Sequence, residues 1–79
     1  KKFERNGGGT MTANDVVFIR WPGRKIDGCP ARVLDIVEAT ESKPGGVLVE
    51  LLEERGQYRS GSDGILPRML LPVAFLDVP

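Results

Sequence analysis

Short apolar runs, separated by stretches rich in glycine, proline and charged residues, set the pattern of most of the chain. Three of these runs are residues 15–21 (DVVFIRW), 31–37 (ARVLDIV) and 47–52 (VLVELL). Each run is rich in β-branched or aromatic side chains and is shorter than a typical helix. Turn-forming residues bound the runs, so each of them predicts a β-strand.

The carboxyl-terminal apolar run, residues 65–78 (ILPRMLLPVAFLDV), contains Pro67 and Pro72. Proline has no amide proton to give to a sheet ladder, so two interpretations are open. The run is either a single edge strand or two short strands joined by a 3-10 turn near residues 72–74, and we favour the second. A helix across residues 65–76 would carry Pro72 in its interior at a cost of about 3 kcal/mol.

Both faces of the predicted strands are apolar. Alternate residues of a strand point to opposite sides, so Val17 and Ile19 share one face of the first strand. Val16 and Phe18 share the other face, and the third strand also has an apolar set on each side. A single sheet cannot bury both faces by itself, so one of them is expected to contact another subunit or a partner. The residues predicted at this interface are Val16, Phe18, Leu48 and Leu52.

Five short strands with regularly spaced turn signals and no convincing helix predict an all-β fold. We expect a small, five-stranded, antiparallel barrel with one 3-10 turn near the C-terminus, a pattern that fits an SH3-like barrel. Residues 11–79 form its single domain. Residues 1–10 (KKFERNGGGT) are expected to be a flexible N-terminal tail with a hinge at its three glycines. We expect this tail to be a cloning remnant or upstream read-through, with Met11 as the natural start.

The composition lacks the residues that usually stabilise a small hydrophobic core through disulfides or zinc. The chain of 79 residues has one cysteine and no histidine, so it has no internal disulfide and none of the usual zinc spacings. Oligomerisation or docking on a larger partner is the remaining support, and we expect a homo-oligomer. The formal charge is zero, from eleven basic and eleven acidic residues, which disfavours nucleic acid as a partner. No apolar run reaches the roughly 20 residues of a membrane span, and the free cysteine is consistent with the cytoplasm.

The sequence offers little catalytic chemistry. Without histidine, no Ser-His or Cys-His catalytic pair exists. General acid-base catalysis at neutral pH would require a carboxylate, Lys, Tyr or Cys with a shifted pKa. Cys29 lies near Arg24, Lys25 and Arg32 in the sequence, which would lower its pKa, although a small residue under the loop is the favoured interpretation. No catalytic residue, metal site or cofactor is therefore predicted.

Aromatic residues beside cations indicate a binding surface in two loops. Trp21 stands next to Arg20 and close to Arg24, and Tyr58 stands next to Arg59. Such a pairing stacks on a planar or apolar group and holds an anionic one. Alternatively, Trp21 caps the barrel and the aliphatic parts of arginine side chains pack over its ring. We favour this structural interpretation. We expect the two loops to converge at one rim.

Two stretches resemble known families. Residues 14–36 resemble the start of Tudor and PWWP modules, with Asp15-Val16-Val17 followed by Pro30-Ala31-Arg32-Val33. The resemblance implies an SH3-like barrel and an aromatic cage for a methylated lysine or arginine, with Trp21 and Tyr58 as walls. Gly28 and Cys29 stand where that family usually has aromatic residues.

Residues 70–78 (LLPVAFLDV) resemble the closing segment of the plasmid-borne type II dihydrofolate reductases, and the matching residues are Pro72, Val73, Ala74 and Leu76. The resemblance implies an SH3-like barrel that assembles as a tetramer around a central pore. The residues that carry this family's chemistry differ: Arg68-Met69-Leu70-Leu71 replaces its Val-Gln-Ile-Tyr, and Ile19 stands near its first-strand lysine. Methionine lacks the donor and acceptor of glutamine, so the resemblance supports a fold and an oligomer rather than the activity.

Together these patterns predict a noncatalytic protein- or peptide-binding module. It would act through the rim of Trp21 and Tyr58 and through the apolar interface face. The alternative is an oligomeric oxidoreductase with a shared central pore lined by residues 68–71, and a purely structural subunit is a third class.

Overall fold

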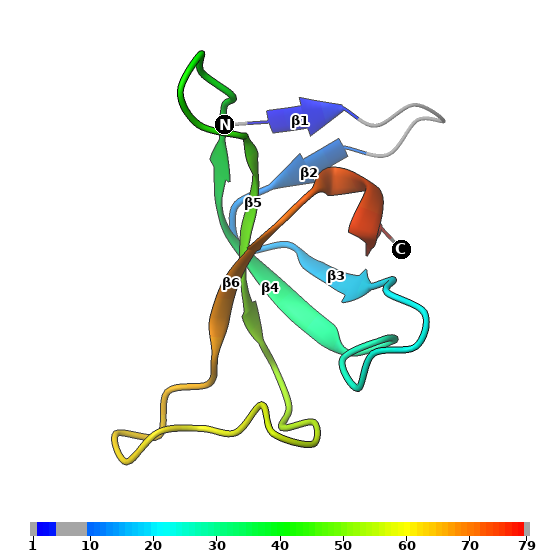
Figure 1. Ribbon diagram of the computed structural model, residues 1–79, viewed down its shortest axis with the longest axis vertical. Coiled ribbons are helices and arrows are strands. Elements are labelled where there is room, and N and C mark those ends of the chain that lie inside the picture. Colours follow the sequence, from blue (N-terminus) through cyan, green and yellow to red (C-terminus); the bar gives the residue numbers. More distant parts are fainter. Residues whose placement is uncertain (1, 5–9, 79) are drawn as a thin grey trace.

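The chain folds into a two-stranded and a five-stranded antiparallel sheet. The computed structural model describes residues 2–4 and 10–78 (Figure 1). Its elements are β1 (Lys2–Glu4), β2 (Thr10–Thr12), β3 (Val16–Ile19), β4 (Pro30–Val37), β5 (Gly46–Leu51), β6 (Arg68–Leu71), the 3-10 turn η1 (Val73–Phe75) and β7 (Leu76–Asp77).

The larger sheet has the strand order β6-β5-β4-β3-β7 and curls into a half-barrel (Figure 1). The last strand returns to the first strand of this sheet, where Phe18 pairs with Asp77 and Ile19 with Leu76. The prediction of an all-β fold with five antiparallel strands and a 3-10 turn near the C-terminus is confirmed. β6 and β7 are the edge strands of the sheet.

Pro72 ends β6 and starts the 3-10 turn. It is the N-cap of η1 at φ −59°, and the Phe75 amide donates to its carbonyl over 2.9 Å. The ring of proline fixes such a φ and removes the amide that a continuing strand would need. Two short strands joined by a turn are therefore correct, and the helix across residues 65–76 does not form.

The concave side of the sheet holds the core. The buried residues, each at most 4% exposed, are Met11, Val17, Ile19, Ile26, Cys29, Ala31, Val33, Ile36, Val47, Val49, Leu51, Leu71 and Leu76. Alternation in β3 agrees with the prediction, because Val17 and Ile19 are buried while Val16 and Phe18 are 42% and 41% exposed. The outer face of the sheet is thus left with apolar side chains.

A bulge in β4 keeps a carboxylate out of the core. The pairing of β4 with β5 shifts between Val33, opposite Val49, and Asp35, opposite Leu48. Strict alternation from Val33 would point Asp35 inward, but the extra residue Leu34 reverses the alternation. Asp35 is therefore exposed, and Ile36 is buried in its place.

Part of the predicted N-terminal tail is described. Residues 2–4 form β1 and pair with β2, with Phe3 opposite Met11. The hinge predicted at Gly7, Gly8 and Gly9 lies outside the described residues. Met11 is buried in the core, so the residue chosen as the natural start is also a packing residue.

Candidate binding surfaces

The loop between β3 and β4, residues 20–29, is a series of hydrogen-bonded turns. The Trp21 amide donates to Asp27 Oδ1 over 2.8 Å, and the Gly28 amide donates to the Ile19 carbonyl over 2.7 Å. Gly28 has φ +78°, a left-handed conformation that glycine adopts without strain. Ile26 is fully buried and anchors the loop to the core. The loop is therefore ordered by hydrogen bonds within it and by the packing of Ile26.

Trp21 lies beside Phe75 at one end of the sheet. The two rings meet edge to face, with centroids 5.0 Å apart and planes at 69°. The guanidinium carbon of Arg24 lies 4.8 Å from the centroid of the Trp21 ring, and the Arg20 amide donates to the Phe75 carbonyl over 2.6 Å. Edge-to-face aromatic pairs and cation-π contacts each stabilise such a cluster modestly. We call Arg20, Trp21, Arg24 and Phe75 the Trp21 rim.

The capping interpretation of Trp21 agrees with these contacts. The ring is half-buried and packs against the core, as Phe75 does. Part of the ring and the charged end of Arg24 remain accessible. Phe75 is a member of the rim that the sequence did not reveal, because it is far from Trp21 in the chain and reaches it only through η1.

The turn that carries Tyr58 docks on the same loop through Arg55. Arg55 and Tyr58 exchange backbone hydrogen bonds of 3.0 and 2.8 Å. The Arg55 guanidinium donates to the Asp27 carbonyl over 3.1 Å and to the Lys25 carbonyl over 3.4 Å, and also pairs with Glu53. A backbone-binding arginine therefore joins the two loops, and the convergence of Trp21 and Tyr58 at one rim stays a prediction.

Tyr58 and Arg59 have different surroundings. Tyr58 is half-buried and packs against the core. Arg59 has a side chain that is 71% exposed and lies 3.7 Å from Glu54. The same Glu54 accepts hydrogen bonds of 2.8 Å from the amide and hydroxyl of Ser60, which lower the pKa of the Glu54 carboxyl. Arg59, the cation predicted beside Tyr58, thus pairs with a carboxylate of its own loop.

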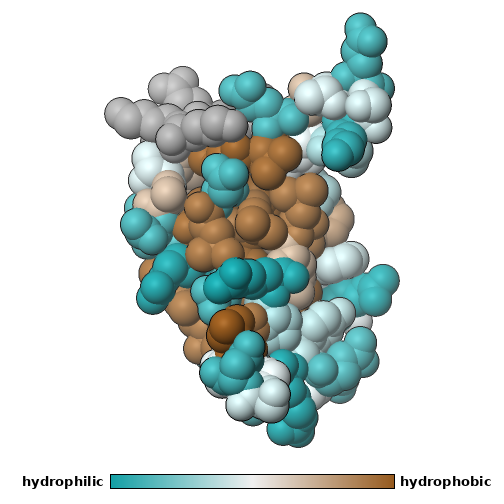
Figure 2. Space-filling view, turned by 90° about the vertical axis from the view of Figure 1, so that its left-hand side faces the viewer, coloured by the Kyte–Doolittle hydropathy of each residue, from teal (hydrophilic) through white to brown (hydrophobic). Residues whose placement is uncertain are grey.

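The four residues predicted at an interface lie on the outer face of the large sheet. Val16 and Phe18 are exposed, whereas Leu48 and Leu52 are half-buried. Leu70 of β6, opposite Leu48 in the register, extends this set and is 44% exposed. The left-hand side of the molecule as drawn in Figure 1 carries hydrophobic residues over its middle, with a band of hydrophilic residues across them (Figure 2).

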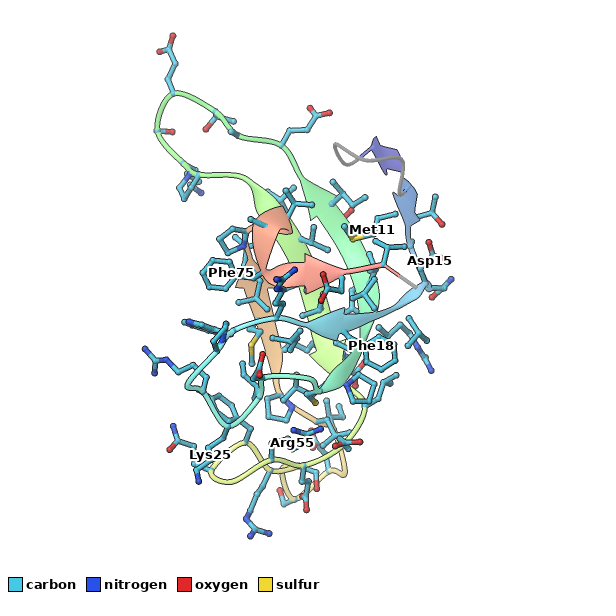
Figure 3. The ribbon with its side chains drawn as sticks, turned by 90° about the vertical axis from the view of Figure 1, so that its right-hand side faces the viewer. Met11, Asp15, Phe18, Lys25, Arg55 and Phe75 are labelled. Atoms are coloured by element: carbon cyan, nitrogen blue, oxygen red, sulfur yellow. The ribbon has the colours of Figure 1, made fainter. Side chains whose placement is uncertain are left out.

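The Trp21 rim and the outer face adjoin at Arg20, whose guanidinium lies 3.7 Å from the carboxylate of Asp77, the residue opposite Phe18. In Figure 3, Phe75 and Phe18 lie on opposite sides of the molecule, and Lys25 and Arg55 lie together at its lower end.

Burial raises the pKa of the Cys29 thiol, and the nearby Arg55 lowers it by less. Cys29 is fully buried, with Sγ 3.4 Å from the Pro30 carbonyl and 3.9 Å from the Glu53 carbonyl. The expectation that the sequence neighbours Arg24, Lys25 and Arg32 lower this pKa is wrong, because burial raises it and the cation that opposes this effect is Arg55. Cys29 is a small residue packed under the loop.

The residues that carry the two family resemblances are distributed between core and surface. In β6, Leu71 is buried and Met69 half-buried, while Arg68 and Leu70 are exposed. Ile19 is buried, as is Cys29, where a Tudor cage would need an aromatic residue. Comparison of the chain with protein-family models, with curated proteins and with solved structures finds no match.

Within residues 2–4 and 10–78, no cluster of three or more histidine, cysteine, aspartate or glutamate residues is placed to hold a metal ion. The same residues include no helix with the length and hydropathy of a membrane span.

Proposed function

We propose that this protein is a noncatalytic binding module, an SH3-like barrel that holds an extended peptide of a protein partner on the Trp21 rim. The observation that carries the proposal is the cluster in which Trp21 meets Phe75 at 5.0 Å and Arg24 lies 4.8 Å over the indole. Partly exposed aromatic rings give a large contact area at low entropic cost, and tryptophan and arginine dominate many binding sites.

The net positive charge of the loop favours an acidic ligand. Residues 20–29 contain Arg20, Arg24 and Lys25 against a single carboxylate, Asp27. The Asp27 carboxylate already accepts a hydrogen bond from the Trp21 amide, so it stabilises the loop itself. A peptide with an acidic side chain next to an apolar or proline ring would place the ring on Trp21 and the carboxylate on Arg24.

The loop is organised in advance of binding. Its backbone hydrogen bonds, buried Ile26 and the contact of Arg55 with the Asp27 carbonyl fix the shape of the rim. A site that is already ordered loses less conformational entropy when it binds, which favours affinity for short peptides. The turn of Tyr58 supports the loop from the other side.

Selection from a displayed library of random twelve-residue peptides tests this function. We expect enriched peptides that combine an acidic with an apolar or proline residue. Calorimetric titration of a synthetic selected peptide is then expected to show at least about fivefold weaker binding to Arg24→Ala, the loss of roughly one charge-assisted hydrogen bond. Lys43→Ala, an exposed cation in the loop between β4 and β5, is the matched control and should bind normally.

Two outcomes would contradict the function. The first is that no peptide is enriched in the selection. Equal affinity of the wild type, Arg24→Ala and Trp21→Ala for the selected peptide is the other, with folding of each variant checked by circular dichroism.

The oligomeric oxidoreductase is the second candidate. It is favoured by the exposure of Arg68 and Leu70 on the edge strand β6, since these residues would line a shared pore. Titration with a reduced nicotinamide cofactor, followed by cofactor fluorescence, separates the two functions. Saturable binding of the cofactor would support the oxidoreductase function, and the absence of any change in cofactor fluorescence would exclude it.

A further inference from the structure

β6 has one edge with no partner strand in the described part of the chain. It is the last strand of the large sheet and pairs with β5 alone. The Leu51 amide donates to the Pro67 carbonyl over 3.0 Å, so the backbone of Pro67 faces β5. Backbone groups of an antiparallel strand point alternately to its two sides, so Met69 also faces β5. The residues before and after Met69 therefore turn their amides and carbonyls to the open side.

Arg68 and Leu70 are the residues of β6 with open backbone groups. Each has one amide donor and one carbonyl acceptor, and none of the backbone hydrogen bonds of the described residues involves them. Pro72, the next residue with this orientation, has no amide, and its carbonyl accepts a hydrogen bond from the Phe75 amide over 2.9 Å. The open ladder therefore ends at Leu70 on its carboxyl side. We call the amides and carbonyls of Arg68 and Leu70 the β6 edge.

The β6 edge lacks most of the features that protect an edge strand from pairing. Proteins blunt such edges with bulges, with prolines on the open side or with charged side chains. The pairing of β5 with β6 has no shift in register, and the amide that Pro67 lacks would have faced β5. Arg68 is charged but lies opposite Glu50, and Leu70 is 44% exposed. This edge is therefore suited to pairing with another strand.

The β6 edge matches itself in one register. A two-fold axis through Met69 sets two copies of β6 antiparallel, with Arg68 of each copy opposite Leu70 of the other. Each opposed pair then exchanges two hydrogen bonds, so every group of the β6 edge is used. An axis through Leu70 would instead place Arg68 opposite Pro72, which has no amide to donate. An axis through Arg68 would place two like charges directly opposite each other, which is unfavourable.

The side chains of β6 agree with the register centred on Met69. Met69 is half-buried, and at the axis it would meet the Met69 side chain of the second copy. Arg68 would lie between Glu50 of its own chain and Leu70 of the second copy, so no like charges are opposed. The aliphatic part of the Arg68 side chain would cover the exposed Leu70 side chain.

We infer that β6 pairs antiparallel with β6 of a second copy of this chain, which joins the two large sheets edge to edge. A strand of unrelated sequence also offers donors and acceptors, but a second copy supplies the matching spacing and the compatible side chains that β6 itself shows. The chain has a single cysteine and thus no internal disulfide, and association is one way in which small domains gain stability. The inference goes beyond peptide binding and does not depend on it, because no residue of the Trp21 rim belongs to β6.

Cross-linking at the axis tests the inference and its register with the full chain. In the pair centred on Met69, the two Met69 Cα atoms lie about 4.5 Å apart, within reach of a disulfide. The two Leu70 Cα atoms lie roughly 8 Å apart, which a disulfide does not span. Under mild oxidation, Met69→Cys is therefore expected to form a covalent pair at least about tenfold faster than Leu70→Cys. Random collision would give the opposite order, because Leu70 is the more exposed of the two residues. The wild type, whose single Cys29 is buried, is the control and should form no covalent pair.

Light scattering after size exclusion measures the association without a cross-link. The wild type is expected to have twice the 8.6 kDa mass of one chain. Leu70→Pro removes an amide of the β6 edge and leaves the ladder with β5 in place, so it is expected to have the mass of one chain. Leu70→Ala keeps this amide, so it is the matched control and should have the mass of two chains. Circular dichroism checks the folding of each variant, and if Leu70→Pro does not fold, the cross-linking rates decide.

Three results would overturn the inference. The first is a wild type with the mass of one chain at the concentrations used for cross-linking. If the NMR signals of its Arg68 and Leu70 amides then shift when a selected peptide is added, the edge binds a peptide instead. The second is a Leu70→Cys variant that cross-links as fast as Met69→Cys. The third is a folded Leu70→Pro variant that still has the mass of two chains.

Discussion

The guanidinium of Arg55 donates a hydrogen bond of 3.1 Å to the backbone carbonyl of Asp27. This contact joins the turn after β5 to the loop after β3, which are 28 residues apart in the sequence. Gly56 brings the two segments close. Its φ is +54°, and a Cβ atom there would lie 3.1 Å from the Lys25 side chain. The support of the Trp21 rim therefore depends on contacts between distant loops.

Arg55→Ala is expected to loosen the loop of residues 20–29 while the sheet stays folded. Removal of the guanidinium leaves the carbonyls of Lys25 and Asp27 without their donor. Hydrogen exchange of the Gly28 and Cys29 amides should then accelerate, because opening of the loop exposes them. Arg59→Ala, whose side chain is 71% exposed and pairs within its own loop, is the control. Unchanged exchange in Arg55→Ala would show that the loop holds its shape without this contact.

Ile26→Val is expected to destabilise the protein by about 1 kcal/mol, the usual cost of removing one buried methylene. In a domain of this size such a loss lowers Tm by about 4–8 °C. Ile65→Val makes the same chemical change at a residue that is 46% exposed, and it should leave Tm nearly unchanged. Equal effects of the two substitutions in thermal unfolding would mean that Ile26 is not a core residue.

The strands could be predicted because their determinants are local. Short β-branched runs between turn residues gave β3, β4 and β5, and the two prolines of the last run separated β6, η1 and β7. Alternation also identified Val16 and Phe18 as outward-facing, since β3 contains no bulge. Alternation alone would have failed in β4, where one extra residue decides that Asp35 points outward.

The parts of the site that the sequence did not reveal depend on distant contacts. Ile26 stands between Lys25 and Asp27 in a polar loop, so no periodicity marks it as a core residue. Phe75 reaches Trp21 only because β7 pairs with β3. Arg55 resembles any exposed cation in a polar loop until the structure shows which carbonyls accept its hydrogen bonds. Each of these residues requires the register of the sheet to be known first.

Cys29 is expected to react slowly with thiol reagents in the folded protein. It is fully buried, and burial raises the pKa of its thiol, so little thiolate exists near neutral pH. Modification by a chromogenic disulfide should be about tenfold or more slower in the native state than in guanidinium chloride. The rate should rise with pH. Equal rates in the native and unfolded states would contradict the packing of Cys29 under the loop.

Glu54 is expected to titrate below the ordinary glutamate pKa of about 4.3. The Ser60 amide and hydroxyl donate to the carboxylate and lower its pKa in the folded state. Its contribution to stability is therefore present above the ordinary pKa and is lost as the pH falls through the lower, folded-state pKa. In an NMR titration Ser60→Ala should move the Glu54 pKa part of the way back, and Ser62→Ala should not. An ordinary Glu54 pKa in the wild type would show that the turn does not hold this carboxylate.

Emission from Trp21, the single tryptophan of the chain, tests the proposed function most directly. Fluorescence of the wild type is recorded during titration with a peptide selected from the displayed library. The account predicts a saturable change in Trp21 emission, with a weaker apparent affinity in Arg24→Ala. A peptide that binds by calorimetry without any change in this emission would contradict binding at the Trp21 rim.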